Sequence, residues 1–147
     1  IFAASILAIG RGGKKPRKDI ATWADAKPYM GFFYDCYYAI TDGYPDRFEN
    51  AVIKKTLECF LESYVFEDEM SVWFDKIKKI ADDLGFASDM KAYRADPAAF
   101  RGSVADISSF IRVAVTGKQN APDLYTVMQI LGEDRTRKRI EAQIAAL

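Results

Sequence analysis

The chain has 147 residues, half of them apolar and 14% aromatic, so it is long enough and apolar enough to bury a core of its own. Its 21 acidic and 21 basic residues cancel, which excludes binding to nucleic acid through net charge alone and leaves that task to local basic clusters. The sequence has no histidine, which excludes histidine-dependent catalysis and histidine metal sites.

Three features of the sequence bear on the cellular compartment of the chain and on whether it is a fragment. Cys36 and Cys59 stand among aromatic and aliphatic neighbours without the close spacing of a zinc site, so we expect two buried free thiols in a cytosolic protein. No apolar run approaches the roughly 20 residues needed to cross a membrane, and no signal peptide is visible. Because the chain opens on Ile1 without a methionine, we expect a fragment of a longer polypeptide. We also expect the protein to be cytoplasmic and monomeric, and to bind neither membranes nor DNA.

Residues 10–18 contain five cations, three glycines and a proline. This composition disfavours a helix and offers no side chains for a core, so we expect an exposed basic linker. Its cations either stay solvated or contact the phosphates of a nucleic acid; they are Arg11, Lys14, Lys15, Arg17 and Lys18.

Two helices are predicted after the linker. The first has Pro28 in its first turn and continues at helical spacing to Tyr37, before a turn over residues 41–46. The second covers residues 49–63, where apolar side chains repeat at steps of three and four. Most of the crowded aromatic side chains of the first helix are expected in the core, with Tyr34 or Tyr38 at the surface: Tyr29, Phe32, Phe33, Tyr34, Tyr37 and Tyr38.

A third helix is predicted from an unbroken apolar stripe. Asp68 can cap its start, and Gly85 can close its end in a left-handed conformation. We expect the whole stripe to face the core: Met70, Trp73, Phe74, Ile77, Ile80, Ala81 and Leu84.

Further helices follow in the second half of the chain. A short helical turn over residues 88–93 precedes Asp96, which can cap a helix start at Pro97. Ser103 then begins a longer apolar helix that stops at Gly117.

The last two helices are predicted for residues 123–131, stopped by Gly132, and from Asp134 onward. The second of these has a narrow apolar seam formed by Ile140, Ile144 and Leu147. Acidic neighbours offset its basic cluster, which we interpret as a solvated helix face: Arg135, Arg137, Lys138 and Arg139.

No segment has the period-two pattern of a strand, so the sequence predicts an all-α fold. A break near Glu67 suggests two small helical subdomains, residues 20–66 and residues 67–147, after the leading residues 1–19.

The most informative segment covers residues 112–124. An apolar helix carries one arginine, Arg112, ends at a glycine and is followed by a short polar loop that leads into Pro122 and a new helix. A planar cation with a fork of donors and a rigid apolar helix start suit the unstacked bases of single-stranded RNA. Taken alone, Arg112 is better explained as a structural residue that snorkels or pairs with Asp106 or Asp123, and the proline as an ordinary helix start.

This segment, with residues 128–135 and 137–140 that follow it, resembles the C-terminal anticodon-binding region of bacterial glutamyl-tRNA synthetases, and the resemblance extends over residues 20–147. It implies a helical architecture that recognises the tRNA anticodon and contributes specificity to the ATP-dependent ligation of glutamate to its tRNA in translation. Residues 1–19 would be the tail of a preceding stem-contact domain together with the basic linker. A helical protein-interaction module without RNA binding is the alternative.

The resemblance implies roles for individual residues. Arg112 matches an arginine that contacts the first anticodon base, and Pro122 and Leu124 match residues that pack against the first two bases. Ala121 stands where the family has a threonine and lacks its hydroxyl, so backbone groups from Asn120 to Pro122 would read the middle base. The arginine that reads the third base has no clear counterpart here.

Catalysis is expected elsewhere. The signature motifs of a nucleotide-binding domain are absent, no catalytic or metal-binding residues are predicted, and we expect the fragment alone to be inactive. The resemblance implies that ATP and magnesium bind to a catalytic domain outside this chain. The implied partner is the tRNA for glutamate.

Overall fold

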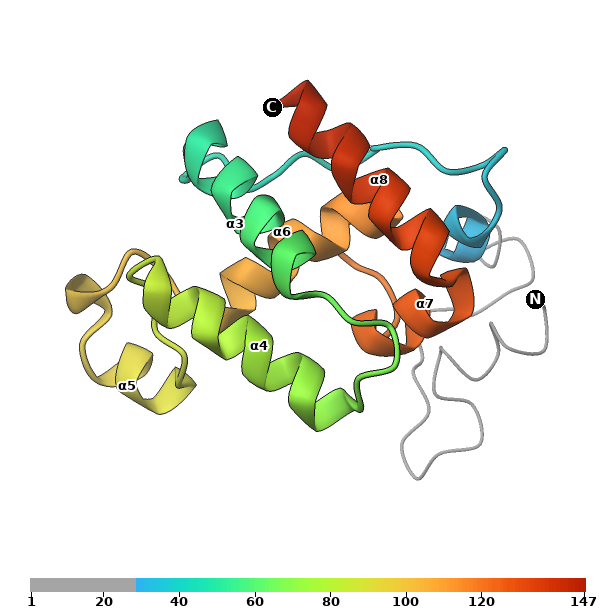
Figure 1. Cartoon of the computed structure of the whole chain (residues 1–147). Helices are drawn as coiled ribbons and strands as arrows, with labels where there is room; N and C mark the ends of the chain where they lie inside the picture. Colours follow the sequence, from blue (N-terminus) through green and yellow to red (C-terminus); the bar gives the residue numbers. More distant parts are fainter. Residues whose placement is uncertain (1–28) are drawn as a thin grey trace.

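The computed structural model describes residues 29–147, and in this part of the chain every regular element is a helix (Figure 1). In chain order they are η1 Gly31–Phe33, α3 Asn50–Ser63, α4 Met70–Asp83, α5 Met90–Ala95, η2 Pro97–Ala99, α6 Val104–Thr116, α7 Leu124–Leu131 and α8 Glu133–Ala146. The predicted all-α class is confirmed. Within the described residues no helix has the length and apolar character to span a bilayer. The cations of the basic linker lie outside the described residues.

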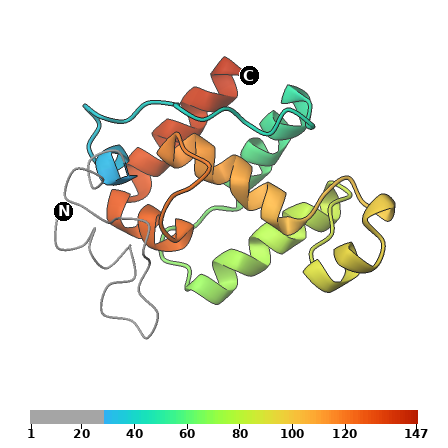
Figure 2. The same ribbon diagram turned by 180° about the vertical axis from the view of Figure 1, so that it is seen from behind.

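Helix α6 packs against four other helices, α3, α4, α7 and α8. It lies behind the layer of α3, α4 and α8 in Figure 1 and in front of that layer in Figure 2, where the molecule is seen from the opposite side. The apolar faces of the helices therefore meet between the two layers.

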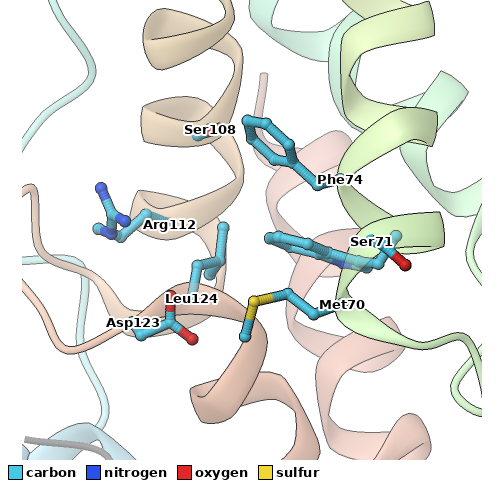
Figure 3. Close-up of a pocket in the computed structure, with 8 residues that line it drawn as sticks. Met70, Ser71, Phe74, Ser108, Arg112, Asp123 and Leu124 are labelled. Atoms are coloured by element: carbon cyan, nitrogen blue, oxygen red, sulfur yellow. The ribbon is translucent and has the colours of Figure 1, made fainter. Parts of the chain in front are cut away.

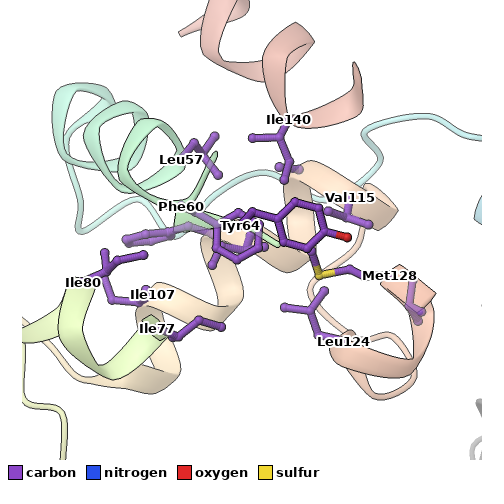
Figure 4. Close-up of a cluster of buried hydrophobic side chains, with 14 of the residues drawn as sticks. Leu57, Phe60, Tyr64, Ile77, Ile80, Ile107, Val115, Leu124, Met128 and Ile140 are labelled. Atoms are coloured by element: carbon purple, nitrogen blue, oxygen red, sulfur yellow. The ribbon is translucent and has the colours of Figure 1, made fainter. Parts of the chain in front are cut away.

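The core occupies this space between the layers (Figure 4). Leu57 and Phe60 enter it from α3, Ile77 from α4, Ile107 from α6 and Ile140 from α8, and each is at most 1% exposed. Burying one such side chain stabilises a fold by about 1.5–3 kcal/mol. The apolar periodicity of the sequence thus identified the side chains that hold the helices together.

Side chains from both sides of Glu67 belong to this one hydrophobic cluster. Helix α3, which precedes Glu67, contacts α4, α6 and α8, which follow it. The division into subdomains 20–66 and 67–147 stays a prediction.

The helix ends agree with most of the predicted signals. At the start of α6 the backbone N–H of Ser103 donates to Oδ2 of Asp106 at 2.8 Å, which completes a capping box. Gly85 and Gly117 adopt positive φ values of 79° and 76° after α4 and α6. The predicted cap at Asp68 is wrong: α4 begins one residue later than that cap requires, after Glu69, and Asp68 instead forms an ion pair with Lys76.

The first predicted helix is wrong beyond Phe33. Residues 31–33 form a short 3₁₀ helix, and the backbone turns extended at Tyr34, with φ −108° and ψ 125°. Local turn bonds follow, from the N–H groups of Tyr37 and Tyr38 to the oxygen of Tyr34, both at 3.0 Å. The Tyr38 hydroxyl also donates to the distant carbonyl oxygen of Ala114 at 2.6 Å. Tyr34 is exposed as expected, but Tyr37 is exposed as well, at 55%.

Three arginines of α8 are not solvated as predicted. Arg139 is 6% exposed; its guanidinium donates to the carbonyl oxygen of Val115 and to Oδ1 of Asp35, each at 2.9 Å, and its Cζ lies 4.0 Å from the ring centre of Tyr38. This hydrogen bond holds the pKa of Asp35 below its ordinary value. The guanidinium of Arg139 therefore connects Asp35, which precedes α3, to the end of α6.

The other two arginines bind backbone carbonyls in the same way. Arg135 donates to the oxygen of Phe33 at 2.8 Å, and Arg137 donates to those of Leu61 and Tyr64 at 3.3 and 2.8 Å. A guanidinium can satisfy carbonyl groups at the ends of several segments because it presents five donors in a fixed plane. Net charge along α8 could not reveal this role.

Both cysteines are free, but only part of the prediction holds. Cys59 is half-buried, whereas Cys36 is exposed because the helix expected to bury it does not form.

Residues 85–103, here called the α5 excursion, leave and rejoin the fold at one point. Ala87 N donates to the oxygen of Gly102 at 2.9 Å, Val104 N to that of Ala87 at 2.8 Å, and Arg101 N to that of Gly85 at 3.0 Å. No residue of α5 or η2 is buried. The excursion is therefore closed at its neck and lies at one end of the molecule (Figure 1).

Candidate nucleic-acid interface

The end of α6 is fixed by a close approach between two backbones. The oxygen of Gly117 accepts hydrogen bonds from the N–H groups of Thr41 and Asp42, both at 3.0 Å. A Cβ at Gly117 would lie 1.9 Å from the oxygen of Ala39, and its φ of 76° already favours glycine. Position 117 thus requires glycine for two independent reasons.

The loop after α6, residues 117–122, is held from both sides. On one side, the Gln119 N–H donates to Oδ2 of Asp42 at 2.8 Å, and its amide nitrogen Nε2 donates to the oxygen of Gly43 at 2.7 Å. On the other, the N–H of Lys118 donates to the Thr116 hydroxyl at 3.2 Å. The loop is fixed before any ligand arrives, which lowers the entropic cost of binding.

Helix α7 begins with a side-chain cap. Oδ2 of Asp123 accepts hydrogen bonds from the N–H of Thr126 at 3.0 Å and from its hydroxyl at 2.8 Å. Ala121 and Pro122 are buried immediately before it, with Ala121 at 4% exposure. Asn120 is exposed at the tip of the loop.

A pocket of about 520 Å³ opens between α4, α6 and the start of α7 (Figure 3). We call it the α4–α7 pocket, and it is lined by Met70, Ser71, Trp73, Phe74, Ser108, Arg112, Asp123 and Leu124. Its volume lies within the roughly 300–1,000 Å³ of small-molecule sites. It joins two of the predicted contact residues, Arg112 and Leu124, in one place.

The charges of the pocket lie on its α6 and α7 sides. Arg112 supplies a half-buried cation and Asp123 an exposed carboxylate. Asp106, the other partner considered for Arg112, is engaged by Ser103 and forms an ion pair with Arg47. A donor fork and an acceptor beside apolar walls can together address the edge of a nucleobase.

The α4 side of the pocket was missed by the sequence prediction. Met70 and Phe74 were expected in the core but are 52% and 37% exposed. Trp73, between them, is buried at 7% exposure, and its ring centre lies 5.5 Å from that of Tyr125. Trp73 and Phe74 are adjacent in sequence, so they point in different directions around α4, and one packing partner cannot cover both. The width of the apolar face was therefore the sequence signal that part of it is exposed.

A second hollow, of about 360 Å³, borders the same loop at Thr116 and Lys118. Its other lining residues include Tyr37 and Thr41 from the segment that holds the loop. The five predicted phosphate contacts of the basic linker lie outside the described residues, so their placement relative to either hollow stays a prediction.

Known proteins match this chain in two ways. Residues 99–144, which include α6 and α7, match a family described as an anticodon binding domain. Over 92% of its length the chain is 40% identical to the glutamate–tRNA ligase of Acetivibrio thermocellus, and over 95% it is 42% identical to that of Sorangium cellulosum. A glutamate–tRNA ligase of Clostridium perfringens is 35% identical over 92% of the chain.

The chain spans about a quarter of the length of these relatives: 25%, 25% and 26%, respectively. The matches nevertheless extend across nearly all of the chain itself, including α3 and α4 ahead of the matched domain. The resemblance is thus confirmed: the chain carries an anticodon-binding domain and is homologous to part of the bacterial glutamate–tRNA ligases.

Proposed function

We propose that this chain recognises the anticodon of the glutamate tRNA and so contributes tRNA specificity to a glutamate–tRNA ligase. The observation that carries the proposal is the α4–α7 pocket, because Arg112 and Leu124 line it within a region homologous to such ligases. Single-stranded loops are recognised through splayed bases that stack on planar groups and present their edges to hydrogen-bonding side chains. The pocket offers both kinds of contact.

The fixed loop supports the same proposal. Residues 117–122 carry the backbone groups expected to read the middle base, and hydrogen bonds from Gln119 to Asp42 and Gly43 hold them in place. Backbone groups can recognise a base only if the loop holds them in place, since a displacement of about 0.5 Å disturbs the hydrogen-bond geometry with the base. The absent hydroxyl at Ala121 leaves this task to the backbone.

The wider roles are proposals about the longer protein. We expect ATP and magnesium to bind to a catalytic domain outside this chain, and the ligase to act as a monomer in the cytoplasm on glutamate and its tRNA. The contribution proposed for the described residues is binding and orientation of tRNA.

Fluorescence anisotropy with a labelled anticodon hairpin of the glutamate tRNA tests the proposal. Arg112→Ala should weaken binding by about ten- to hundredfold, because a hydrogen bond to a charged group contributes about 1.5–3 kcal/mol. Arg94→Ala is the matched control, since Arg94 is exposed on α5 outside the pocket and its loss changes the net charge equally.

The RNA provides the second control. Hairpins with substituted anticodon bases should bind the wild-type chain more weakly than the cognate hairpin at the same salt concentration. Equal affinity for all hairpins, unchanged by Arg112→Ala, would contradict anticodon reading and favour a helical protein-interaction module.

A further inference from the structure

Helix α4 exposes apolar side chains where the pocket opens. Phe74 and Met70 are 37% and 52% exposed, although every large side chain that α4 directs to the core is almost fully buried, such as Ile77 at 0%. Clustered exposed apolar side chains that line a cavity commonly mark a binding site. Here they belong to the pocket that also contains Arg112 and Asp123.

The two sides of the pocket differ in chemistry. Figure 3 shows Phe74 and Met70 reaching from α4 towards α6 and α7, while Arg112 and Asp123 lie on the opposite side. The Nζ of Lys78 lies 4.9 Å from the ring centre of Phe74, and it pairs with Oδ1 of Asp75 at 3.1 Å. A ligand that fits must combine a flat apolar face with a polar edge.

We propose that Phe74, with Met70 beside it, is the stacking wall for one unstacked base of the RNA loop. The inference rests on the proposed function and deepens it by adding α4 to the binding surface. The base would place its face against the ring of Phe74 and its edge towards Arg112 and Asp123. Stacking tolerates any base because each has a π face, so Phe74 supplies affinity and the polar side supplies selectivity.

Substitutions on α4 test the stacking role with the anticodon hairpin as probe. Phe74→Ala should weaken binding about tenfold, because base–aromatic stacking contributes about 1–3 kcal/mol per base. Phe74→Tyr keeps a flat ring and should bind like the wild type. Val72→Ala is the matched control, since Val72 is an exposed apolar residue of α4, at 45%, that does not line the pocket.

A double-mutant cycle identifies the stacked base. Seven hairpins, each with one abasic loop position, are titrated against wild type and Phe74→Ala. At the position that stacks, removing the base should weaken wild-type binding about tenfold and abolish the effect of Phe74→Ala, since the partner is gone. Thermal unfolding followed by circular dichroism verifies that each variant is folded at the temperature of the titration.

The outcomes separate this inference from the proposed function. Anticodon-dependent binding that Phe74→Ala leaves unchanged, or weakens equally with every abasic hairpin, overturns the stacking wall and leaves anticodon recognition intact. A loss equal to that of Val72→Ala also overturns it. Absence of anticodon-dependent binding by the wild-type chain overturns both.

Discussion

At the residue scale, Gly117 shows how one position fixes the interface. Its oxygen accepts two backbone hydrogen bonds from residues 41 and 42, its φ is 76°, and its Cα faces the oxygen of Ala39. A side chain there meets backbone atoms, which cannot move aside as a flexible side chain can. The exposed loop that follows therefore depends on a buried contact with a segment 76 positions earlier in the sequence, as between Thr41 and Gly117.

Gly117→Ala should lower the free energy of unfolding by about 3 kcal/mol or more, because it adds backbone strain of about 1–2 kcal/mol to an overpacking cost of about 1–3 kcal/mol. Gly85→Ala is the matched control. Gly85 also has a positive φ, 79°, but its Cβ would meet only the Arg101 side chain at 3.6 Å. It should lose only the strain cost of about 1–2 kcal/mol. Urea unfolding measures both, and equal losses would contradict the role of the Ala39 contact.

At the element scale, the sequence predicted both ends of α6 but not the exposed wall of α4. The capping box of α6 and the glycine after it could be predicted because both act through neighbours in sequence. The exposed wall of α4 could not, since a periodic apolar stripe does not say whether a helix or a ligand covers it. Phe74 is the example: it continues the stripe yet borders a pocket.

Asp123→Ala should lower the free energy of unfolding by about 1 kcal/mol, because α7 loses the carboxylate that caps its first turn. Asp123→Asn should recover most of this loss, since an asparagine caps about as well. Thermal unfolding of the two variants measures the difference. Identical melting of Asp123→Ala and wild type would show that the cap does not stabilise the helix.

At the scale of the whole molecule, the arginines of α8 connect segments that are distant in sequence. Arg139 joins Asp35 to the end of α6, and Arg137 closes the end of α3. Local charge balance favoured a solvated face for these residues, because the partners are backbone carbonyls that no charge count includes. For the same reason the end of the helix at Phe33 was not predicted, since Arg135 binds the oxygen of Phe33 and Arg139 binds Asp35 from far along the chain.

The ion pair of Asp35 with Arg139 makes stability depend on pH. Because the folded pKa of Asp35 lies below its ordinary value of 3.8, the carboxylate stabilises the fold above about pH 4 and loses this effect as pH falls through the lower folded value. Asp35→Asn should therefore be less stable than wild type at pH 7, by at most about 1 kcal/mol because Asp35 is largely exposed.

The difference between Asp35→Asn and wild type should shrink as pH falls below about 4. Urea unfolding at pH 7, 4 and 3 measures it. A difference independent of pH would show that the side-chain hydrogen bond, and not the charge of Asp35, stabilises the fold.

The closed neck of the α5 excursion has a practical consequence for experiments. Backbone hydrogen bonds close residues 85–103 at their base, and η2 contains no buried residue, so a change in η2 alters no buried side chain. Loop tips of this kind tolerate insertions and attached groups well. Ala98, exposed in η2, is therefore a suitable position for a fluorophore or a surface tether on this chain.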